Sequence, residues 1–195
     1  MKKRIITIAG FPGSGKSSAA KGVALHLGYE HFSSGDFFRK MAAERNLSIE
    51  EINFTAETQK EIDREVDKLL VKMGKEKNDF VIDSRTAFHW IQDSFKVFLD
   101  LNPRIAAERT FAQIQKEGRK SQAGSSVEEV YENTAKRVES ERKRYQNLYN
   151  IDVTDKTNFD LVVDTEINNL EEVIEIVIKA YKKWLNIPGL KNESR

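Results

Sequence analysis

The sequence predicts an α/β fold, in which a five-stranded parallel sheet is covered by helices on both faces. Short runs of β-branched and aromatic residues alternate with longer helical patterns, the order in which helical crossovers join parallel strands. The first run, residues 5–9, is almost wholly apolar, as expected of a strand buried on both faces. The chain has 195 residues, enough for one such domain and short for two, and no repeat or linker divides it.

The elements follow one another with recognisable boundaries. Gly28 lies just past the first helical pattern, and Pro103 suits the first turn of a later helix. We expect strands at residues 5–9, 29–32, 80–83, 96–100 and 161–163. We expect helices at residues 16–27, 35–44, 49–73, 103–116, 127–149 and 170–185, with a break near 46–48. Because the pattern at 49–73 has no strand of its own, we interpret it as an insertion that packs beside the sheet.

Charge and composition exclude several classes of protein. The 32 basic and 31 acidic residues leave a net charge of +1, so no general basic field favours nucleic acid or a membrane as a partner. Without cysteine, neither disulfides nor thiolate metal sites can form. The apolar run after the basic first residues is too short for a signal peptide, and no stretch is long enough to span a bilayer. We expect a cytoplasmic monomer that binds neither nucleic acid nor membranes.

Residues 10–17, with the sequence G-F-P-G-S-G-K-S, match the phosphate-loop pattern G-x-x-x-x-G-K-[ST] directly after a strand and at the start of a helix. The glycines let successive backbone N–H groups point at a β-phosphate, and the helix N-terminus adds partial positive charge. Lys16 is expected to reach the β- and γ-phosphates, and the Ser17 hydroxyl to bind Mg²⁺. The fold class is therefore that of a P-loop NTPase, with Mg²⁺ and ATP as cofactors. The predicted ATP-binding residues are Gly10, Phe11, Pro12, Gly13, Ser14, Gly15, Lys16, Ser17 and Ser18.

The phosphate loop identifies only the phosphate donor, because switches, motors, helicases and small-molecule kinases share it. A second polar patch, residues 34–39, follows the second strand and so lies at the carboxyl edge of the sheet, where ligands bind in such folds. Its Arg39 has the planar fork that suits a phosphate. The alternative is that Ser34 caps a helix and Arg39 is solvated.

A third patch surrounds Asp83, which ends a buried strand. A carboxylate in this position is our candidate for the ligand of a water bound to Mg²⁺. Arg85 lies two residues further on and is expected to point into the same cleft, because side chains alternate along a strand. The alternative is that Asp83 only caps the next helix.

A fourth patch consists of Arg137, Glu141 and Arg144, whose spacing places them on one face of a helix. This face either turns inward to a substrate or is a salt-bridged face exposed to solvent. Residues 118–126, just before this helix, have the polar, glycine-containing composition of a mobile lid.

In this order, the motifs resemble those of cytidylate kinases, in particular the short type common in archaea and some bacteria. The matching pieces are S-G-x-x-[FY]-R at 34–39, an acid-x-arginine strand end at 83–85, R-x-x-x-[DE]-x-x-R at 137–144 and I-D-x-x-[IV]-D at 62–67. The resemblance spans nearly the whole chain and implies a nucleoside monophosphate kinase of pyrimidine nucleotide metabolism that moves the γ-phosphate of ATP onto CMP or dCMP. Ser84 replaces the family's usual glycine, and Thr86 stands where many members have aspartate.

The resemblance also implies roles for individual residues. Arg39 and Arg144 are implied to hold the CMP phosphate, and Arg85 and Glu141 to contact its base or ribose. The implied CMP site consists of Ser34, Arg39, Arg85, Arg137, Glu141 and Arg144. The catalytic candidates are Lys16, Asp83 and Arg144, with Mg²⁺ bound directly by Ser17 and through water by Asp83. The acceptor is itself an ionised phosphate, so we nominate no general base.

The whole chain, residues 1–195, is expected to be a single P-loop kinase domain. Its core comprises 1–44, 77–117 and 159–186, its nucleoside-monophosphate-binding insertion 45–76 and its lid 118–150. One alternative is a kinase of the same architecture with another acceptor, such as AMP, UMP, shikimate or dephospho-CoA. Another is a nucleotide-binding switch, although residues 98–102 offer no N-K-x-D guanine motif. His26, His31 and His89 show no metal-ligand spacing, and we interpret each as structural or exposed.

Overall fold

The computed structural model describes residues 3–48, 51–52, 55–56, 59–117, 124 and 126–186. Within these residues the strands form one five-stranded sheet with the order β2-β3-β1-β4-β5, and every neighbouring pair is parallel. The predicted fold class is therefore confirmed. The strands are β1 (Ile5–Gly10), β2 (Glu30–Ser33), β3 (Phe80–Asp83), β4 (Phe95–Asp100) and β5 (Leu161–Asp164).

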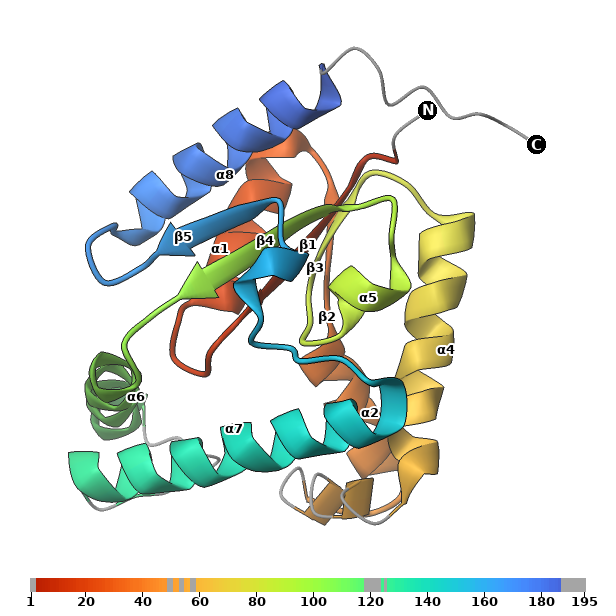
Figure 1. The fold of residues 1–195 in the computed structure, drawn as a ribbon. Coiled ribbons are helices and arrows are strands. Elements are labelled where there is room, and N and C mark those ends of the chain that lie inside the picture. The colour runs from red at the N-terminus through yellow and green to blue at the C-terminus, as the bar shows by residue number, and fades with distance from the viewer. Residues whose placement is uncertain are drawn as a thin grey trace.

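The helices lie on both faces of this sheet (Figure 1). They are α1 (Lys16–Leu27), α2 (Ser34–Glu44), α4 (Lys60–Glu76), α5 (Ala87–Trp90), α6 (Pro103–Glu117), α7 (Val127–Tyr149), the 3₁₀ helix η1 (Lys156–Asn158) and α8 (Leu170–Leu185). Side chains alternate along a strand, so β1 sends Ile6 and Ile8 to one face and Ile5 and Ala9 to the other.

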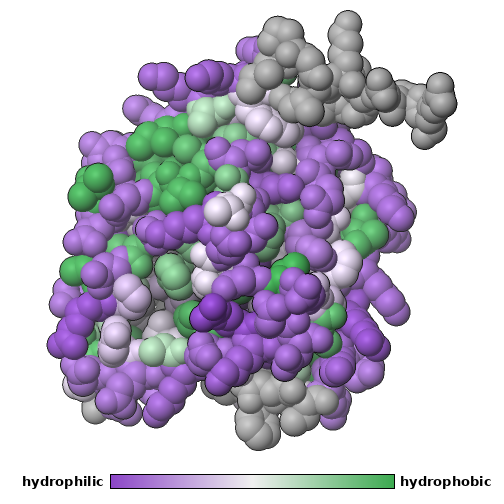
Figure 2. All heavy atoms as spheres, in the orientation of Figure 1, coloured by the Kyte–Doolittle hydropathy of each residue, from purple (hydrophilic) through white to green (hydrophobic). Residues whose placement is uncertain are grey.

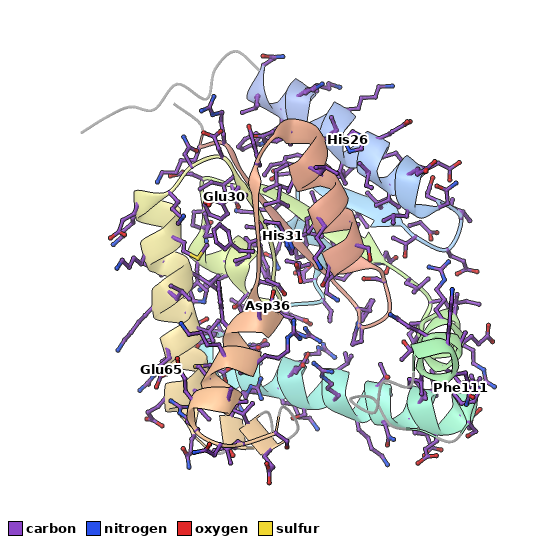
Figure 3. The ribbon with its side chains drawn as sticks, turned by 180° about the vertical axis from the view of Figure 1, so that it is seen from behind. His26, Glu30, His31, Asp36, Glu65 and Phe111 are labelled. Atoms are coloured by element: carbon purple, nitrogen blue, oxygen red, sulfur yellow. The ribbon has the colours of Figure 1, made fainter. Side chains whose placement is uncertain are left out.

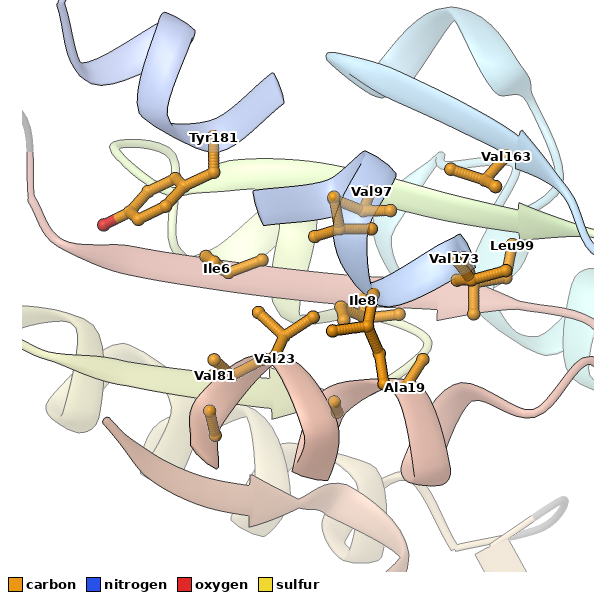
Figure 4. Packing of buried hydrophobic residues seen from close by; sticks show 14 of the residues in the cluster. Ile6, Ile8, Ala19, Val23, Val81, Val97, Leu99, Val163, Val173 and Tyr181 are labelled. Carbon is orange, nitrogen blue, oxygen red and sulfur yellow. The ribbon is translucent and has the colours of Figure 1, made fainter. Parts of the chain in front are cut away.

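On the first face, α1 and α8 pack on the centre of the sheet and enclose the largest hydrophobic cluster (Figure 4). Gly22 of α1 makes this packing close, because a Cβ atom there would lie only 2.2 Å from Cδ1 of Ile174 on α8. Tyr181 of α8 is 1% exposed and shares a hydroxyl–hydroxyl hydrogen bond of 3.1 Å with Tyr29. The phosphate loop leads directly into α1, so the packing of α1 on this face also fixes the end of the loop.

On the second face, α4 packs through Val66, Leu70 and Met73 against β1 and β3. The C-terminal part of α7 reaches the same side, where Tyr145 joins a cluster with Ala9 and Phe98. Helix α7 begins beside α6 and runs past the carboxyl ends of the strands toward α4 (Figure 1). It therefore links the sheet to the predicted insertion.

Several boundaries differ from the sequence prediction, two of them for local reasons that the structure shows. Strand β2 begins at Glu30 rather than Tyr29, because the Tyr29 N–H still donates to Ala24 O in the turn that ends α1. The helix predicted at 49–73 is interrupted at Gln59, whose backbone is extended: residues 51–52 and 55–56 are helical, and α4 follows from Lys60 to Glu76. Residues 49–50, 53–54 and 57–58 of that prediction lie outside the described residues, as do 118–123 and 125 of the predicted lid.

The short helix α5 was missed, because four residues are too few to show a helical period. The surface seen in Figure 2 is largely hydrophilic, with hydrophobic side chains gathered over the β5 and α8 region. Exposed apolar residues there are Val162, Ile167 and Leu170. Within the described ranges, no helix has both the length and the apolar character needed to cross a membrane.

Candidate active site

The phosphate loop connects β1 to α1 at the carboxyl edge of the sheet. Gly10 has a φ of 145°, and a Cβ atom there would lie 2.3 Å from Leu99 O. Gly13 has a φ of 80°, and its Cβ would lie 2.9 Å from Ala106 O. Only glycine fits these two positions, so the loop closes tightly between β4 and α6 as the motif predicts.

Lys16, the first residue of α1, reaches back over this loop. Its Nζ donates a hydrogen bond to Phe11 O at 2.8 Å. Burial, together with the nearby Arg85 guanidinium, lowers the pKa of Lys16 to about 7 against the opposing effect of Asp83. Two cations held this close favour the binding of a polyanion between them.

Asp83, at the end of β3, is 6% exposed and is held by three side chains from two elements, α1 and β2. Its Oδ2 accepts hydrogen bonds from Ser17 Oγ and Ser33 Oγ, each at 2.9 Å. Its Oδ1 accepts a hydrogen bond from His31 Nε2 at 2.7 Å. Burial alone raises the pKa of Asp83, but the bonds from His31, Ser17 and Ser33 outweigh it and hold the pKa below its ordinary value. Asp83 is therefore a carboxylate, and the alternative that it caps a helix is wrong, because Thr86 takes that position.

The Ser17 hydroxyl and the Asp83 carboxylate are hard oxygen donors of the kind that Mg²⁺ prefers. Their direct hydrogen bond places both beside the loop that would hold the nucleotide phosphates. In the described part of the chain, no group of three acidic or histidine side chains could bind a metal by itself. The hydroxyl of Ser17 and the carboxylate of Asp83 therefore fit Mg²⁺ as two oxygen ligands, one direct and one through water.

On the opposite side of the loop, Glu141 of α7 is 8% exposed and lies between two guanidinium groups. It is paired with Arg85 Nε and, at 3.0 Å, with Arg137 Nε. Burial raises the pKa of Glu141, but the Arg85 and Arg137 charges more than offset it and keep the pKa below its ordinary value. Arg85 lies beyond the last residue of β3, so the turn before α5, rather than strand alternation, directs it to Glu141.

Arg144, also on α7, lies against Asp63 of α4. The Arg144 Nε and Asp63 Oδ2 atoms are 3.0 Å apart, and the two side chains are 10% and 3% exposed. The Arg144 guanidinium also lies over the Tyr145 ring, 5.2 Å from its centroid. One turn further along both helices, Tyr149 donates a hydrogen bond to Asp67. The face of α7 that carries Glu141 and Arg144 is therefore turned inward, and the alternative of a solvated face is wrong for these two residues.

The two residues predicted on α2 are placed differently. Arg39 is paired with Asp36 of the same helix, and its side chain is 61% exposed. Ser34 is the first residue of α2 and is half-buried, while Ser33 occupies the cap position. The structure thus gathers Lys16, Arg85, Arg137, Glu141 and Arg144 but leaves Arg39 in contact with its neighbour on the surface.

Sequence reasoning missed His31, Ser33 and Asp63. His31 was interpreted as structural or exposed, yet its side chain is 16% exposed and bonds to Asp83. The available signal was that His31 and Ser33 are polar residues two apart in a strand, so they share a face. The pairing of Ser33 with Asp83 across β2 and β3 turns that face to the site, and this pairing cannot be read from one strand alone.

A parallel sheet with a glycine-rich loop after its first strand, and a hydroxyl–carboxylate pair beside that loop, defines a P-loop nucleotide-binding protein. A family model described as an AAA domain matches residues 9–147. The structure is similar to that of shikimate kinase from Bacteroides thetaiotaomicron, with a TM-score of 0.64 and 16% identity over 94% of this chain and 98% of that one. At this identity the similarity establishes the fold alone.

Two relatives are closer in sequence. The cytidylate kinase of Pyrococcus abyssi is 40% identical over 177 residues, which cover 90% of this chain and 92% of the relative. The cytidylate kinase of Natronomonas pharaonis is 37% identical over 183 residues, covering 91% and 90%. The chain belongs to the cytidylate kinase family, as the motif resemblance predicts.

Proposed function

We propose that this protein transfers the γ-phosphate of ATP to CMP or dCMP and so produces CDP or dCDP. The observation that supports this most directly is a continuous row of charged side chains. It runs from the phosphate loop to the predicted insertion and consists of Lys16, Arg85, Glu141, Arg137, Arg144 and Asp63. A kinase that joins two polyanions needs cations for the donor phosphates and for the acceptor phosphate, and this row supplies both.

At the donor end, the backbone N–H groups of residues 13–16 and the Lys16 ammonium group would hold the ATP phosphates. Ser17 would bind Mg²⁺ directly, and Asp83 would hold a water of the metal. When bound, Mg²⁺ neutralises charge on the phosphate oxygens as the transferred group leaves. The tight loop around Gly10 and Gly13 fixes these donors in advance, so little reorganisation is needed during the reaction.

At the acceptor end, Arg144 and Arg39 would hold the phosphate of CMP, while Arg85 and Glu141 would contact the base or ribose. The side chains of Arg144 and Arg39 already rest against carboxylates, Asp63 and Asp36. An incoming phosphate would replace these carboxylates as the anionic partner. Because the CMP phosphate oxygen is itself the nucleophile and is already ionised, no side chain has to remove a proton.

The proposed division of the chain into core, insertion and lid follows the same geometry. The sheet with α1, α6 and α8 forms the core, residues 45–76 bind the nucleoside monophosphate, and residues 118–150 form the lid. The contacts of α7 with α4 and Arg85 support this division, since they join residues of all three parts. Closing the lid over both substrates would exclude water and protect ATP from hydrolysis.

A panel of acceptors tests the proposal. ADP release from ATP would be followed with CMP, dCMP, UMP, AMP or shikimate as acceptor, and with no acceptor. CMP and dCMP should give the highest kcat/KM, UMP a lower value, and AMP and shikimate little above the background. Better turnover of AMP or shikimate than of CMP would refute the acceptor assignment.

Two controls accompany the panel. The Lys16→Ala variant should fold but release almost no ADP with any acceptor, because it lacks the cation at the donor phosphates. Turnover that is equal with and without CMP would instead indicate a nucleotide-binding switch that hydrolyses its own nucleotide.

A further inference from the structure

His31 lies on β2 and faces the donor site from the edge strand of the sheet. Ser33 pairs with Asp83 across β2 and β3, and His31, two residues earlier, points to the same face. Figure 3 shows His31 within β2, well separated from His26 on α1. The His31 side chain is 16% exposed, and its Nε2 lies 2.7 Å from Asp83 Oδ1.

The hydrogen bonds to Asp83 are divided unequally between its two oxygens. Among the described residues, Ser17 and Ser33 both donate to Oδ2, while His31 donates to Oδ1. A carboxylate oxygen offers about two acceptor positions. Oδ2 is therefore saturated, and Oδ1 retains one position for a further donor.

The His31 bond also acts differently from the two serine bonds. Rotation of a carboxylate about its last torsion is only weakly restricted by the side chain itself. Two donors on the same oxygen fix the place of that oxygen, but they leave the plane of the group free to tilt around it. A donor on Oδ1 fixes the second oxygen as well, and thereby the plane.

We propose that His31 is a positioning residue for the Mg²⁺ site: its bond to Oδ1 orients the Asp83 carboxylate so that the remaining Oδ1 acceptor position meets a metal-bound water. Ser17 contacts Asp83 through its hydroxyl proton, so its oxygen keeps lone pairs for the metal. His31 thus acts through Asp83 and touches neither nucleotide nor metal. The inference rests on the proposed donor site and is independent of which acceptor the protein uses.

The test is binding of ADP by isothermal titration calorimetry, with saturating Mg²⁺ and separately with EDTA, in the absence of any acceptor. We define the Mg²⁺ factor as the ratio of the ADP affinity with saturating Mg²⁺ to the ADP affinity in EDTA. Loss of a residue that orients a metal ligand typically costs about 10–100-fold in metal affinity or activity. His31→Leu should therefore lower the Mg²⁺ factor about tenfold or more, while the affinity for ADP in EDTA stays at the parent value.

Two further variants sharpen the result. His31→Gln places an amide N–H at a similar distance from the backbone and should recover most of the Mg²⁺ factor. His26→Leu removes a histidine whose Nδ1 lies 3.0 Å from Gly22 O on the same helix, so it should behave like the parent. If His31→Leu does not fold, His31→Asn replaces it, because the shorter amide cannot reach Oδ1.

Several outcomes would overturn the proposal. One is an unchanged Mg²⁺ factor in His31→Leu or His31→Asn; another is an equal loss of ADP affinity with and without Mg²⁺, which is what a purely structural histidine predicts. If Mg²⁺ did not change the ADP affinity of the parent protein, both this inference and the proposed donor site would be overturned. A wrong acceptor assignment would leave every one of these measurements unchanged.

Discussion

Asp63 is a single carboxyl group in an unusual environment. It is 2% exposed, and burial raises its pKa to about 6 despite the opposing charge of Arg144. In the unfolded chain the pKa returns to its ordinary value of 3.8. Between these two values the folded state binds the proton more tightly, so the contribution of Asp63 to stability grows as the pH falls.

This linkage predicts a specific pH dependence. The free energy of unfolding of the parent should rise relative to that of Asp63→Asn as the pH falls from about 7 to 4, and the gain should level off below the unfolded pKa. At 1.36 kcal/mol per pKa unit, the full gain is roughly 3 kcal/mol. Urea unfolding of both proteins at pH 7, 5.5 and 4 measures this gain. The contributions of other titrating groups cancel in the difference between the two proteins. A difference that does not vary with pH would show that Asp63 has an ordinary pKa.

Among individual residues, the sequence predicted those whose role follows from their neighbours in the chain. Lys16 and Ser17 follow from one loop motif, and Asp83 from its place at the end of a buried strand. His31 and Asp63 could not be predicted in this way, because each acquires its role from a partner on another element, Asp83 on β3 and Arg144 on α7. The spacing of residues along one element does not encode such partners.

Among the secondary-structure elements, α1 and α8 approach unusually closely at Gly22. A Cβ at this position would lie 2.2 Å from Cδ1 and 2.9 Å from Cγ1 of Ile174. Ile174 is 7% exposed and β-branched, so it has little freedom to move aside. The contact therefore fixes the distance between two helices that support the phosphate loop.

Gly22→Ala should consequently destabilise the protein, although alanine favours a helix over glycine by about 1 kcal/mol. Overpacking a filled core typically costs about 1–3 kcal/mol, so the net effect should be a loss of about 1 kcal/mol or more. In an Ile174→Ala background, the same substitution should stabilise, because the clash is gone and the helix preference remains. Denaturant unfolding of the four proteins of this cycle gives the coupling energy, with Lys21→Ala as the exposed control. If Gly22→Ala changed the stability in the same direction in both backgrounds, the predicted clash with Ile174 would be contradicted.

Sequence patterns located most elements well, since strands and long helices have distinct periods. The limits of β3 match the prediction, and α7 and α8 begin and end where it placed them. The interruption of the helix predicted at 49–73 was missed, because helical composition continues through Gln59 and nothing in this residue type requires an extended backbone. Local composition does not report a break of this kind.

In the molecule as a whole, the cations of the site are balanced by carboxylates of the chain itself. Glu141 lies between Arg85 and Arg137, Asp63 lies against Arg144, and the net charge is +1. Such internal pairing lets a nearly neutral protein keep several guanidinium groups half-buried and close together. The sequence placed Arg137, Glu141 and Arg144 on one helix face, but it could not predict that α4 supplies a compensating carboxylate.

Helix α7 contacts both Arg85 and α4, so we expect Arg144 to affect both stability and catalysis, and the two effects can be separated. Arg144→Ala leaves the Asp63 charge buried without its partner, which typically costs about 3–5 kcal/mol of stability. The double variant Asp63→Asn/Arg144→Ala removes both charges and should recover most of that loss. Neither variant can bind the CMP phosphate through Arg144, so both should lose on the order of 100-fold in kcat/KM for CMP.

The control for this prediction is Lys143→Ala on the same helix. Lys143 is 71% exposed and pairs only at the surface with Glu139, so its loss should change stability by about 0–1 kcal/mol and leave kcat/KM unaltered. Thermal unfolding and steady-state kinetics at saturating ATP measure both quantities for the four proteins. If the double variant regained kcat/KM along with its stability, Arg144 would serve only to join α7 to α4. A persistent kinetic loss in a stable double variant is the result expected of a residue that holds the acceptor phosphate.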